Sequence, residues 1–213
     1  MIRTLGHRLL FSAFKMLYNW FSKIYTLKIR KQKKQTSFEI CFILLFGGEG
    51  GIDFVHLRKP DADINACRKL LSELTNEERT KIIIHDFPEL YFEFSLKGIH
   101  INRNVTSLPN DYKGYKTRSC HSLEEIIKYK NDYDYLFLSP IFDSISKIGY
   151  KSGFSGQELL EASASGIIDE KVIALGGVTF DKIPYLQELH FGGVAMIGGL
   201  YNMKALDLLI EQE

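Results

Sequence analysis

The chain has 213 residues, of which 45% are hydrophobic and 25% are charged. This composition is typical of one soluble globular domain, and the length is near the lower end for a (β/α)8 barrel. The three cysteines have unrelated spacings, which exclude a disulfide framework or a cysteine metal site and favour a reducing, cytoplasmic location. No apolar run approaches the ~20 residues that span a bilayer, so no stable membrane insertion is expected.

Charge is distributed unevenly along the chain, although the net charge is only +1. Residues 1–36 hold nine Lys/Arg and no acidic residue, whereas residues 37–213 hold 18 basic and 26 acidic side chains and thus a net charge of −8. This basic leader fits an amphipathic membrane-surface helix, a transit-type peptide, or a segment from an altered start or reading frame that is foreign to the domain. We favour the third interpretation and expect the core domain at residues 37–213.

Downstream of the leader, short apolar runs alternate with helical patterns. We predict strands at Phe54–Arg58, Lys81–His85, Gly98–Ile101, Thr117–Cys120, Tyr135–Pro140, Val172–Gly177 and Gly193–Gly198. We predict helices from Asp61 to about Arg79, from the capping box Ser122–Glu125, and over Ser155–Ile168 and Thr179–His190. Alternation of strands and helices indicates a parallel sheet with right-handed crossovers. We therefore predict an α/β fold, a (β/α)8 TIM barrel, with a doubly wound open sheet as the alternative.

The first βα unit of this barrel is expected to be atypical or incomplete. An eight-stranded barrel needs one more strand and helix before Phe54, and the nearest apolar run is Phe38–Phe46. If that run were the first strand, only seven residues would remain for a crossover that needs a dozen or more. We therefore interpret Phe38–Phe46 as the end of the first helix, and we expect the first strand near residues 24–29 in the leader.

Functional residues of such barrels lie at the carboxyl ends of the strands. Here those ends carry basic groups, hydroxyls and glycines: His56, Arg58, Lys59, His85, Asp86, Asn102, Arg103, Ser119, His121, Ser139, Ser144, Ser146, Lys147, Gly176, Gly177, Gly198 and Gly199. Ser144, Ser146 and Lys147 can hold a phosphate together, because the ammonium supplies charge and the hydroxyls donate hydrogen bonds. The late Gly-Gly pairs let backbone amides approach an anion closely, and tight packing of strand on helix is the alternative explanation.

Seven motifs, in order along the chain, resemble those of the thiamine phosphate synthase/TenI family. They are HLRKP, the pair HD after a strand, GIHI, SCHSLEE, SPIFDSISK, ALGGV and FGGVAMIGG, and they cover roughly Gly50–Tyr201. The resemblance implies a (β/α)8 barrel that binds thiazole phosphate, its carboxylated form or thiamine phosphate. Its synthase branch joins aminopyrimidine pyrophosphate to thiazole phosphate with Mg²⁺ and releases pyrophosphate. Its TenI branch aromatises the thiazole phosphate by moving a proton.

The same resemblance implies where the substrate lies. It places the phosphate of the thiazole near Ser144, Ser146, Lys147, Gly177 and the backbone of Ile197 and Gly198. We expect further substrate or phosphate contacts at His56, Arg58, His85, Ser119 and Gly176. His100, in the middle of a strand, is expected to be structural.

Departures from the synthase motifs favour the TenI branch. The motif Q-L-R-x-K keeps its Leu and Arg here, but His and Pro replace its Gln and Lys. Asp86 can serve as one Mg²⁺ ligand, whereas Val105 occupies the position of the second family carboxylate. One carboxylate with a diphosphate holds this hard cation only weakly unless Asn104 or Asp111 compensates. Mg²⁺ is therefore expected only if the protein is synthase-like.

His121, within SCHSLEE, corresponds to the histidine that acts as acid or base in the TenI branch. An unperturbed histidine pKa of about 6.5 suits proton transfer near neutral pH, and a hydrogen bond to the helix start is the structural alternative. We predict a TenI-like thiazole tautomerase in which His121 is catalytic. The alternatives are a thiamine phosphate synthase, a non-catalytic sensor or carrier of thiamine phosphate, and an inactive product of a damaged gene. Small-molecule phosphates are the expected partners, with no nucleic acid and a homodimer as the expected assembly.

Overall fold

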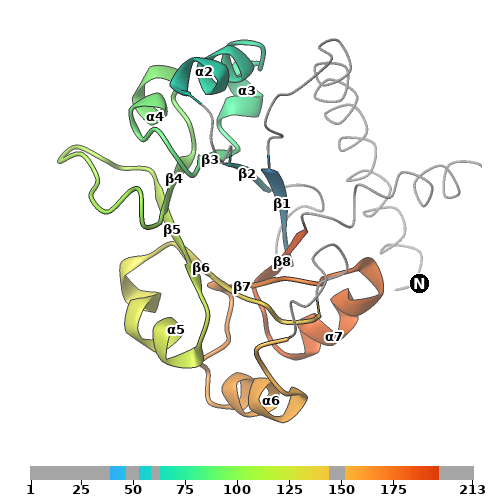
Figure 1. The fold of residues 1–213 in the computed structure, drawn as a ribbon. Coiled ribbons are helices and arrows are strands. Elements are labelled where there is room, and N and C mark those ends of the chain that lie inside the picture. Colours follow the sequence, from blue (N-terminus) through green and yellow to red (C-terminus); the bar gives the residue numbers. More distant parts are fainter. Residues whose placement is uncertain (1–38, 47–52, 59–62, 144–151, 197–213) are drawn as a thin grey trace, which may run out of the picture.

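The structure is organised around a ring of short β-strands with helices on the outside (Figure 1). The computed structural model describes residues 39–46, 53–58, 63–143 and 152–196. Seven strands run parallel in chain order: β2 (Phe54–Arg58), β3 (Ile82–Ile84), β4 (Gly98–Ile101), β5 (Tyr115–Cys120), β6 (Tyr135–Leu138), β7 (Val172–Leu175) and β8 (Gly193–Met196). These are the seven strands that the sequence predicts, which confirms the α/β class.

The remaining strand corrects the prediction for the start of the domain. Residues Glu39–Leu45 form β1, which pairs antiparallel with both β2 and β8, so that Phe42 lies opposite Val55 and Met196. The interpretation of Phe38–Phe46 as the end of a helix is therefore wrong. A long crossover is needed only between parallel neighbouring strands, whereas an antiparallel pair can be joined by a short turn.

Polar contacts hold the two ends of the β1–β2 connection together. The backbone N–H of Asp53 donates to the carbonyl of Ile43 at 3.0 Å, and the Asp53 carboxylate accepts from the N–H of Leu45 at 2.8 Å.

The strands are hydrogen-bonded to one another in the order β1 to β8, and β8 is hydrogen-bonded to β1. This arrangement has seven parallel strands and one antiparallel strand, and so differs from the predicted eight parallel βα units. The strand expected near residues 24–29 lies outside the described residues.

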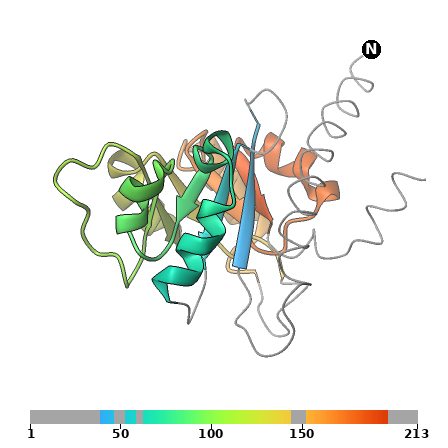
Figure 2. The ribbon, with the colours of Figure 1, turned by 90° about the horizontal axis from the view of Figure 1, so that it is seen from above.

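Helices flank the strands on the outer side of the ring (Figure 2). They are α2 (Ile64–Ser72), α3 (Asn76–Arg79), α4 (Glu89–Phe94), α5 (Leu123–Tyr129) followed by the 3₁₀ turn η1 (Lys130–Asp132), α6 (Gly156–Ala164), and η2 (Phe180–Lys182) leading into α7 (Ile183–Glu188). The predicted helix from Asp61 to Arg79 is two helices, because a capping box of Thr75 and Glu78 begins α3. Among the described residues, no helix has both the length and the apolar character needed to cross a membrane.

Two helix starts were predictable from their caps, and one helix was not. Ser122 accepts a hydrogen bond from the N–H of Glu125 at the start of α5, and Ser155 forms a full capping box with Glu158 at α6. Helix α4 follows Pro88, which provides no side-chain cap, and this helix is not among the predicted elements. A helix without a capping side chain lacks the local signal from which its start could be read.

Alternating side chains give the ring an outer and an inner layer. On the outer side, Val55 and Leu57 pack with Leu70 and Leu71 of α2 in one apolar cluster. Inside the ring lies a smaller cluster of Ile43, Tyr135, Phe137, Ile173 and Ala195, against which Leu45, Phe54, Tyr115 and Leu175 pack. His56, two residues after Phe54 and on the same face of β2, is buried beside this inner cluster. The interior of the ring therefore contains this apolar inner cluster and, nearer the carboxyl ends of the strands, buried polar groups.

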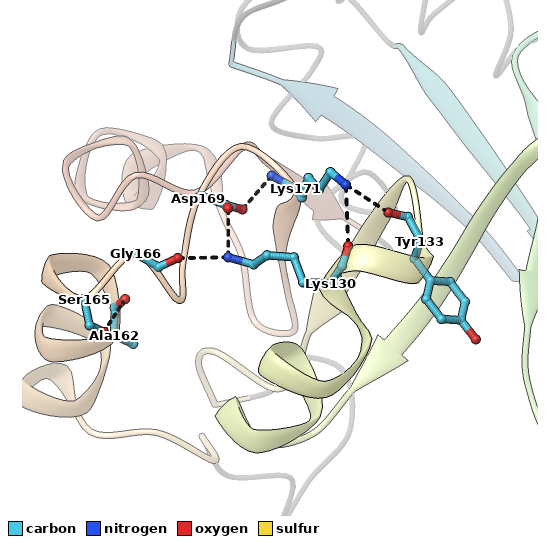
Figure 3. A network of polar contacts seen from close by, with 7 residues as sticks. All are labelled: Lys130, Tyr133, Ala162, Ser165, Gly166, Asp169 and Lys171. Atoms are coloured by element: carbon cyan, nitrogen blue, oxygen red, sulfur yellow. Dashed lines mark hydrogen bonds and ion pairs between the residues drawn. The ribbon is translucent and has the colours of Figure 1, made fainter.

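A polar network ties the segments that enter β6 and β7 (Figure 3). The Lys130 ammonium donates to Asp169 Oδ2 at 2.8 Å and to the Gly166 carbonyl at 2.9 Å, while the Lys171 N–H donates to Asp169 Oδ1 at 2.9 Å. The Lys171 ammonium reaches the carbonyl of Tyr133 at 3.4 Å. Because Tyr133 and Lys171 precede β6 and β7, this network lies at the amino ends of the strands. It stabilises the end of the ring opposite the predicted site.

The position of β1 predicts a strong effect of Ile43→Ala on stability. Ile43 has no exposed surface and belongs to the inner cluster, so the substitution should lower the free energy of unfolding by about 2–5 kcal/mol. Ile127 on α5 is 59% exposed, and Ile127→Ala should change the free energy of unfolding by no more than about 0.5 kcal/mol. Urea unfolding of both variants checks this. Equal effects would mean that Ile43 does not lie inside the ring.

Candidate functional site

The predicted site residues that the structure describes come from neighbouring parallel strands. Strands β2 to β6 are neighbours in the sheet, so their carboxyl ends meet at one end of the ring, which we call the mouth. They bring Arg58, Asp86, Asn102, Ser119, His121 and Ser139 toward it. Lys59, Ser144, Ser146, Lys147, Ile197 and Gly198 lie outside the described residues, and their roles stay predictions.

Three histidines meet inside the ring just beneath the mouth. His56 Nδ1 and His85 Nε2 lie 2.7 Å apart and share a hydrogen bond. The rings of His85 and His100 are stacked, with centroids 4.1 Å apart and planes 17° from parallel. His56 and His100 are 1% and 3% exposed. Neighbouring strands β2, β3 and β4 thus converge on one histidine cluster, defined here as His56, His85 and His100.

Hydroxyl groups from β5 and β6 bind the outer nitrogens of this histidine cluster. Tyr135 Oη lies 2.6 Å from His56 Nε2, and Thr117 Oγ1 lies 2.8 Å from His100 Nδ1. Ser119, a predicted contact residue, lies with its Oγ 3.2 Å from His100 Nε2. Thr117 and Tyr135 are not among the predicted contact residues. The available signal was the alternation along the strand, because Thr117 and Ser119 share a face of β5.

Burial keeps the histidine cluster neutral. It lowers the pKa of His56 and of His85 well below 6.5. Mutual repulsion among the imidazoles, if protonated, lowers both further, and the charge of Arg58 adds to the lowering at His85. The pKa of His100 is lowered to about 3, first by burial and then by the charges of Arg118 and Arg58. Neutral imidazoles donate and accept hydrogen bonds and can bind metals, but they supply no charge to a phosphate. The predicted phosphate contact of His56 stays a prediction that this buried, neutral state does not favour.

His121 differs from the histidine cluster because its side chain is exposed at the mouth. Its Nδ1 lies 2.9 Å from the carbonyl oxygen of Ser139. A carbonyl only accepts hydrogen bonds, so Nδ1 carries a proton, and in the neutral tautomer the lone pair is on Nε2. The backbone N–H of His121 donates to Glu125 Oε2 at 2.6 Å, which anchors the residue to the start of α5. This arrangement gives the mouth an anchored imidazole whose Nε2 is not engaged by the bond to Ser139.

Gly176 and Gly177 pack closely against the segment that follows β6. Their φ angles are 96° and 61°, a region that favours glycine. A Cβ on Gly177 would lie 2.3 Å from the carbonyl oxygen of Asp143, and one on Gly176 would lie 2.9 Å from Pro140 Cα. Close packing therefore accounts for this pair and positions the chain just before Ser144. Phosphate binding by the two glycines stays a prediction.

The predicted Mg²⁺ ligand has limited support around it. Asp86 Oδ1 accepts a hydrogen bond from Asn104 Nδ2 at 3.2 Å, while Val105 is buried in the outer apolar cluster. Among the described residues, the histidine cluster is the one group of three or more His, Cys, Asp or Glu side chains placed to share a metal ion, and Asp86 is not in it. Asp86 alone does not make a magnesium site, since Mg²⁺ demands several oxygen ligands.

Comparison with known proteins links the chain to one family. The family model described as thiamine monophosphate synthase (TMP-TENI) matches residues 32–200. The thiamine-phosphate synthase of Helicobacter pylori strain J99 is 26% identical over 197 residues, covering 88% of this chain and 83% of the relative. The corresponding protein of Bacteroides thetaiotaomicron is 24% identical over 179 residues, covering 78% of this chain and 83% of its own.

Solved structures give the same result. The crystal structure of thiamine phosphate pyrophosphorylase from Bacteroides thetaiotaomicron superposes with a TM-score of 0.64 at 39% identity, covering 71% of this chain and 73% of that chain. A thiamine phosphate pyrophosphorylase from Pyrococcus furiosus has a TM-score of 0.55 at 19% identity, covers 70% and 75%, and supports the fold alone.

Acidification should destabilise the protein through the histidine cluster. The unfolded chain takes up a proton on each imidazole near pH 6.5, whereas the pKa of His100 is about 3 in the folded protein. The folded state therefore binds fewer protons below pH 6.5. The contribution of His100 to stability is complete above that pH and is lost as the pH falls toward 3, at about 1.4 kcal/mol per unit.

Urea unfolding at about pH 7.5 and about pH 5 measures this loss. His100→Asn should reduce the difference in unfolding free energy between the two pH values by about 2 kcal/mol. His190→Asn, at an exposed histidine, is the matched control and should leave the difference unchanged. The same pH difference in wild type and His100→Asn would show that His100 is not held neutral by folding.

Proposed function

Since the chain belongs to the thiamine monophosphate synthase (TMP-TENI) family, we propose that this enzyme of thiamine biosynthesis binds thiazole phosphate at the mouth and transfers a proton on it. The reaction is a TenI-like tautomerisation that aromatises the thiazole ring. The supporting observation is the geometry of His121, whose exposed side chain is oriented by the hydrogen bond from Nδ1 to the Ser139 carbonyl at 2.9 Å, a bond that does not involve Nε2.

His121 can move one proton between two atoms of the substrate. Its Nε2 accepts a proton from a ring carbon of the thiazole, which converts the imidazole into imidazolium and leaves the electron pair on the substrate. The Ser139 carbonyl stabilises the imidazolium because Nδ1–H already donates to it. The same Nε2 then returns the proton to another substrate atom. No electron, metal or second reactant is consumed.

The phosphate of the substrate supplies the binding energy in this proposal. Ser144, Ser146 and Lys147 are the predicted partners, in which the ammonium provides charge and the hydroxyls provide direction. Gly177 holds the chain that leads into them through close contact with Asp143. Arg58, exposed at the end of β2, adds positive charge at the same end of the ring.

A thiamine phosphate synthase activity is the second candidate. The names of the relatives favour it, because the protein in the 39% identical solved structure is called a thiamine phosphate pyrophosphorylase. Asp86 would be a carboxylate ligand for Mg²⁺ in this reaction, whereas Val105 at the second family position cannot bind the cation. The aminopyrimidine pyrophosphate would itself have to complete the coordination of the cation. The surroundings of Asp86 are therefore less complete than those of His121.

The proton-transfer proposal predicts a specific split between catalysis and binding. His121→Ala should reduce thiazole tautomerisation by about 100–10,000-fold, the usual worth of a general acid–base group. It should leave the affinity for thiazole phosphate, measured by calorimetric titration, unchanged. Lys147→Ala is the matched control and should weaken that affinity through loss of a charged phosphate contact.

A direct assay with both synthase substrates separates the two candidates. Purified protein is mixed with aminopyrimidine pyrophosphate, thiazole phosphate and Mg²⁺, and thiamine phosphate is measured. Formation at ordinary enzyme rates would replace the tautomerase proposal with synthase activity. Unchanged tautomerisation in His121→Ala would exclude His121 as the acid–base group. Tight thiamine phosphate binding without either reaction would identify a sensor or carrier.

A further inference from the structure

The histidine cluster forms a group of facing nitrogen donors that the proton-transfer proposal leaves unused. One ring nitrogen from each of His56, His85 and His100 lies within 4.8 Å of the other two. We propose that these three residues form a binding site for one borderline transition-metal dication, of the Zn²⁺ or Co²⁺ class, inside the ring. This site lies beneath the mouth and is distinct from the predicted Mg²⁺ position at Asp86.

The donor set determines the class of ion. Three imidazole nitrogens suit zinc, cobalt, nickel and copper, whereas Mg²⁺ and Ca²⁺ prefer oxygen ligands. Imidazole binds a metal only in its neutral form, and burial already holds the histidine cluster in that form. The protein thus provides deprotonated ligands at neutral pH without having to displace a bound proton from each ring.

The outer hydrogen bonds orient two of the rings toward a shared point. Tyr135 Oη engages His56 Nε2 at 2.6 Å, which leaves His56 Nδ1 to face His85. Thr117 Oγ1 engages His100 Nδ1 at 2.8 Å, so His100 Nε2 is the ligand atom in this proposal. The ion then replaces the longer contact of 3.2 Å between His100 Nε2 and Ser119 Oγ. A hydrogen bond on the far nitrogen of a histidine ligand is the usual support of a metal site. Two of the three ligand rings therefore already have a hydrogen-bond partner on the nitrogen that faces away from the ion.

Binding requires a small, definable rearrangement. His56 Nδ1 and His85 Nε2 are 2.7 Å apart, whereas two ligands of a tetrahedral zinc ion at about 2.05 Å are about 3.3 Å apart. The ion replaces the hydrogen bond between these two nitrogens, and the proton they share moves to an outer nitrogen. His85, stacked on His100 and less buried than its two partners, is the ring that turns.

Positive charge near the histidine cluster affects which ligand can occupy the fourth coordination position of the metal ion. The Arg58 guanidinium acts on both His85 and His100, so it disfavours a bare dication and favours an anion as the fourth ligand. Three protein ligands leave such a position open, as in zinc sites that bind small molecules. The site is therefore expected to hold the metal together with an anion such as phosphate.

Cobalt titration of the full chain tests the proposal. The protein is treated with a chelator, dialysed, and titrated with Co²⁺ while the visible absorption of tetrahedral cobalt is followed. We expect one Co²⁺ per chain, without the intense band of a cysteine–cobalt bond, and displacement by Zn²⁺. The chain has six histidines, which permits a matched design. The His56→Asn/His100→Asn variant should bind Co²⁺ at least about 100-fold more weakly, and His7→Asn/His121→Asn/His190→Asn should bind it like wild type.

A milder variant keeps the test decisive if the double variant does not fold, as judged by circular dichroism. Tyr135→Phe retains all three ligands and removes the hydroxyl at His56 Nε2, so it should keep the cobalt spectrum but weaken binding by about 10–100-fold. Absence of Co²⁺ binding by wild type would overturn the site. Loss of binding in the His7/His121/His190 variant, or unchanged affinity in Tyr135→Phe, would also overturn it. None of these results depends on tautomerase activity.

Discussion

Burial of uncharged histidines in the interior of the strand ring is the constraint on which the rest of this structure depends. A buried imidazole is tolerated only when its nitrogens have partners, and here those partners come from different strands. His56 is bonded to His85 and Tyr135, and His100 to Thr117, so β2 to β6 must keep one register relative to one another. The apolar inner cluster around Phe137 lies against the same rings and excludes water from that side.

The ring therefore contains two different environments for histidine near its mouth. The buried histidine cluster is neutral and hydrogen-bonded, suited to coordination or to directed hydrogen bonds. His121, in contrast, lies at the exposed rim and is anchored by the Ser139 carbonyl and by Glu125. A proton acceptor needs access to substrate, whereas a metal ligand needs a neutral ring in a defined orientation. The parallel strands place these histidines at different depths, and the two proposals, proton transfer at His121 and metal binding at the histidine cluster, depend on that difference.

The sequence predicts the parallel strands well because most of them are short apolar runs between turn and cap signals, with the more polar β5 as the exception. It fails at β1, since an argument from crossover length presupposes parallel pairing and Glu39–Leu45 pairs antiparallel on both sides. It also misses α4, which follows Pro88 without a capping side chain. No local sequence pattern indicates the histidine cluster, because His56, His85 and His100 are far apart in sequence. Only the neighbouring order of β2, β3 and β4 together with the inward-facing positions brings them together.

Nitrogen-15 NMR of the histidine rings between about pH 5.5 and about pH 8 tests the central claim most directly, because it reports the protonation state of each ring nitrogen. The account predicts that the ring signals of His56, His85 and His100 remain those of neutral imidazoles throughout this range, each with one protonated nitrogen. Titration of these three rings with midpoints near the ordinary histidine pKa of about 6.5 would contradict it. In that case the interior of the ring would be accessible to water and charge, and neither the fixed register nor the metal site would follow.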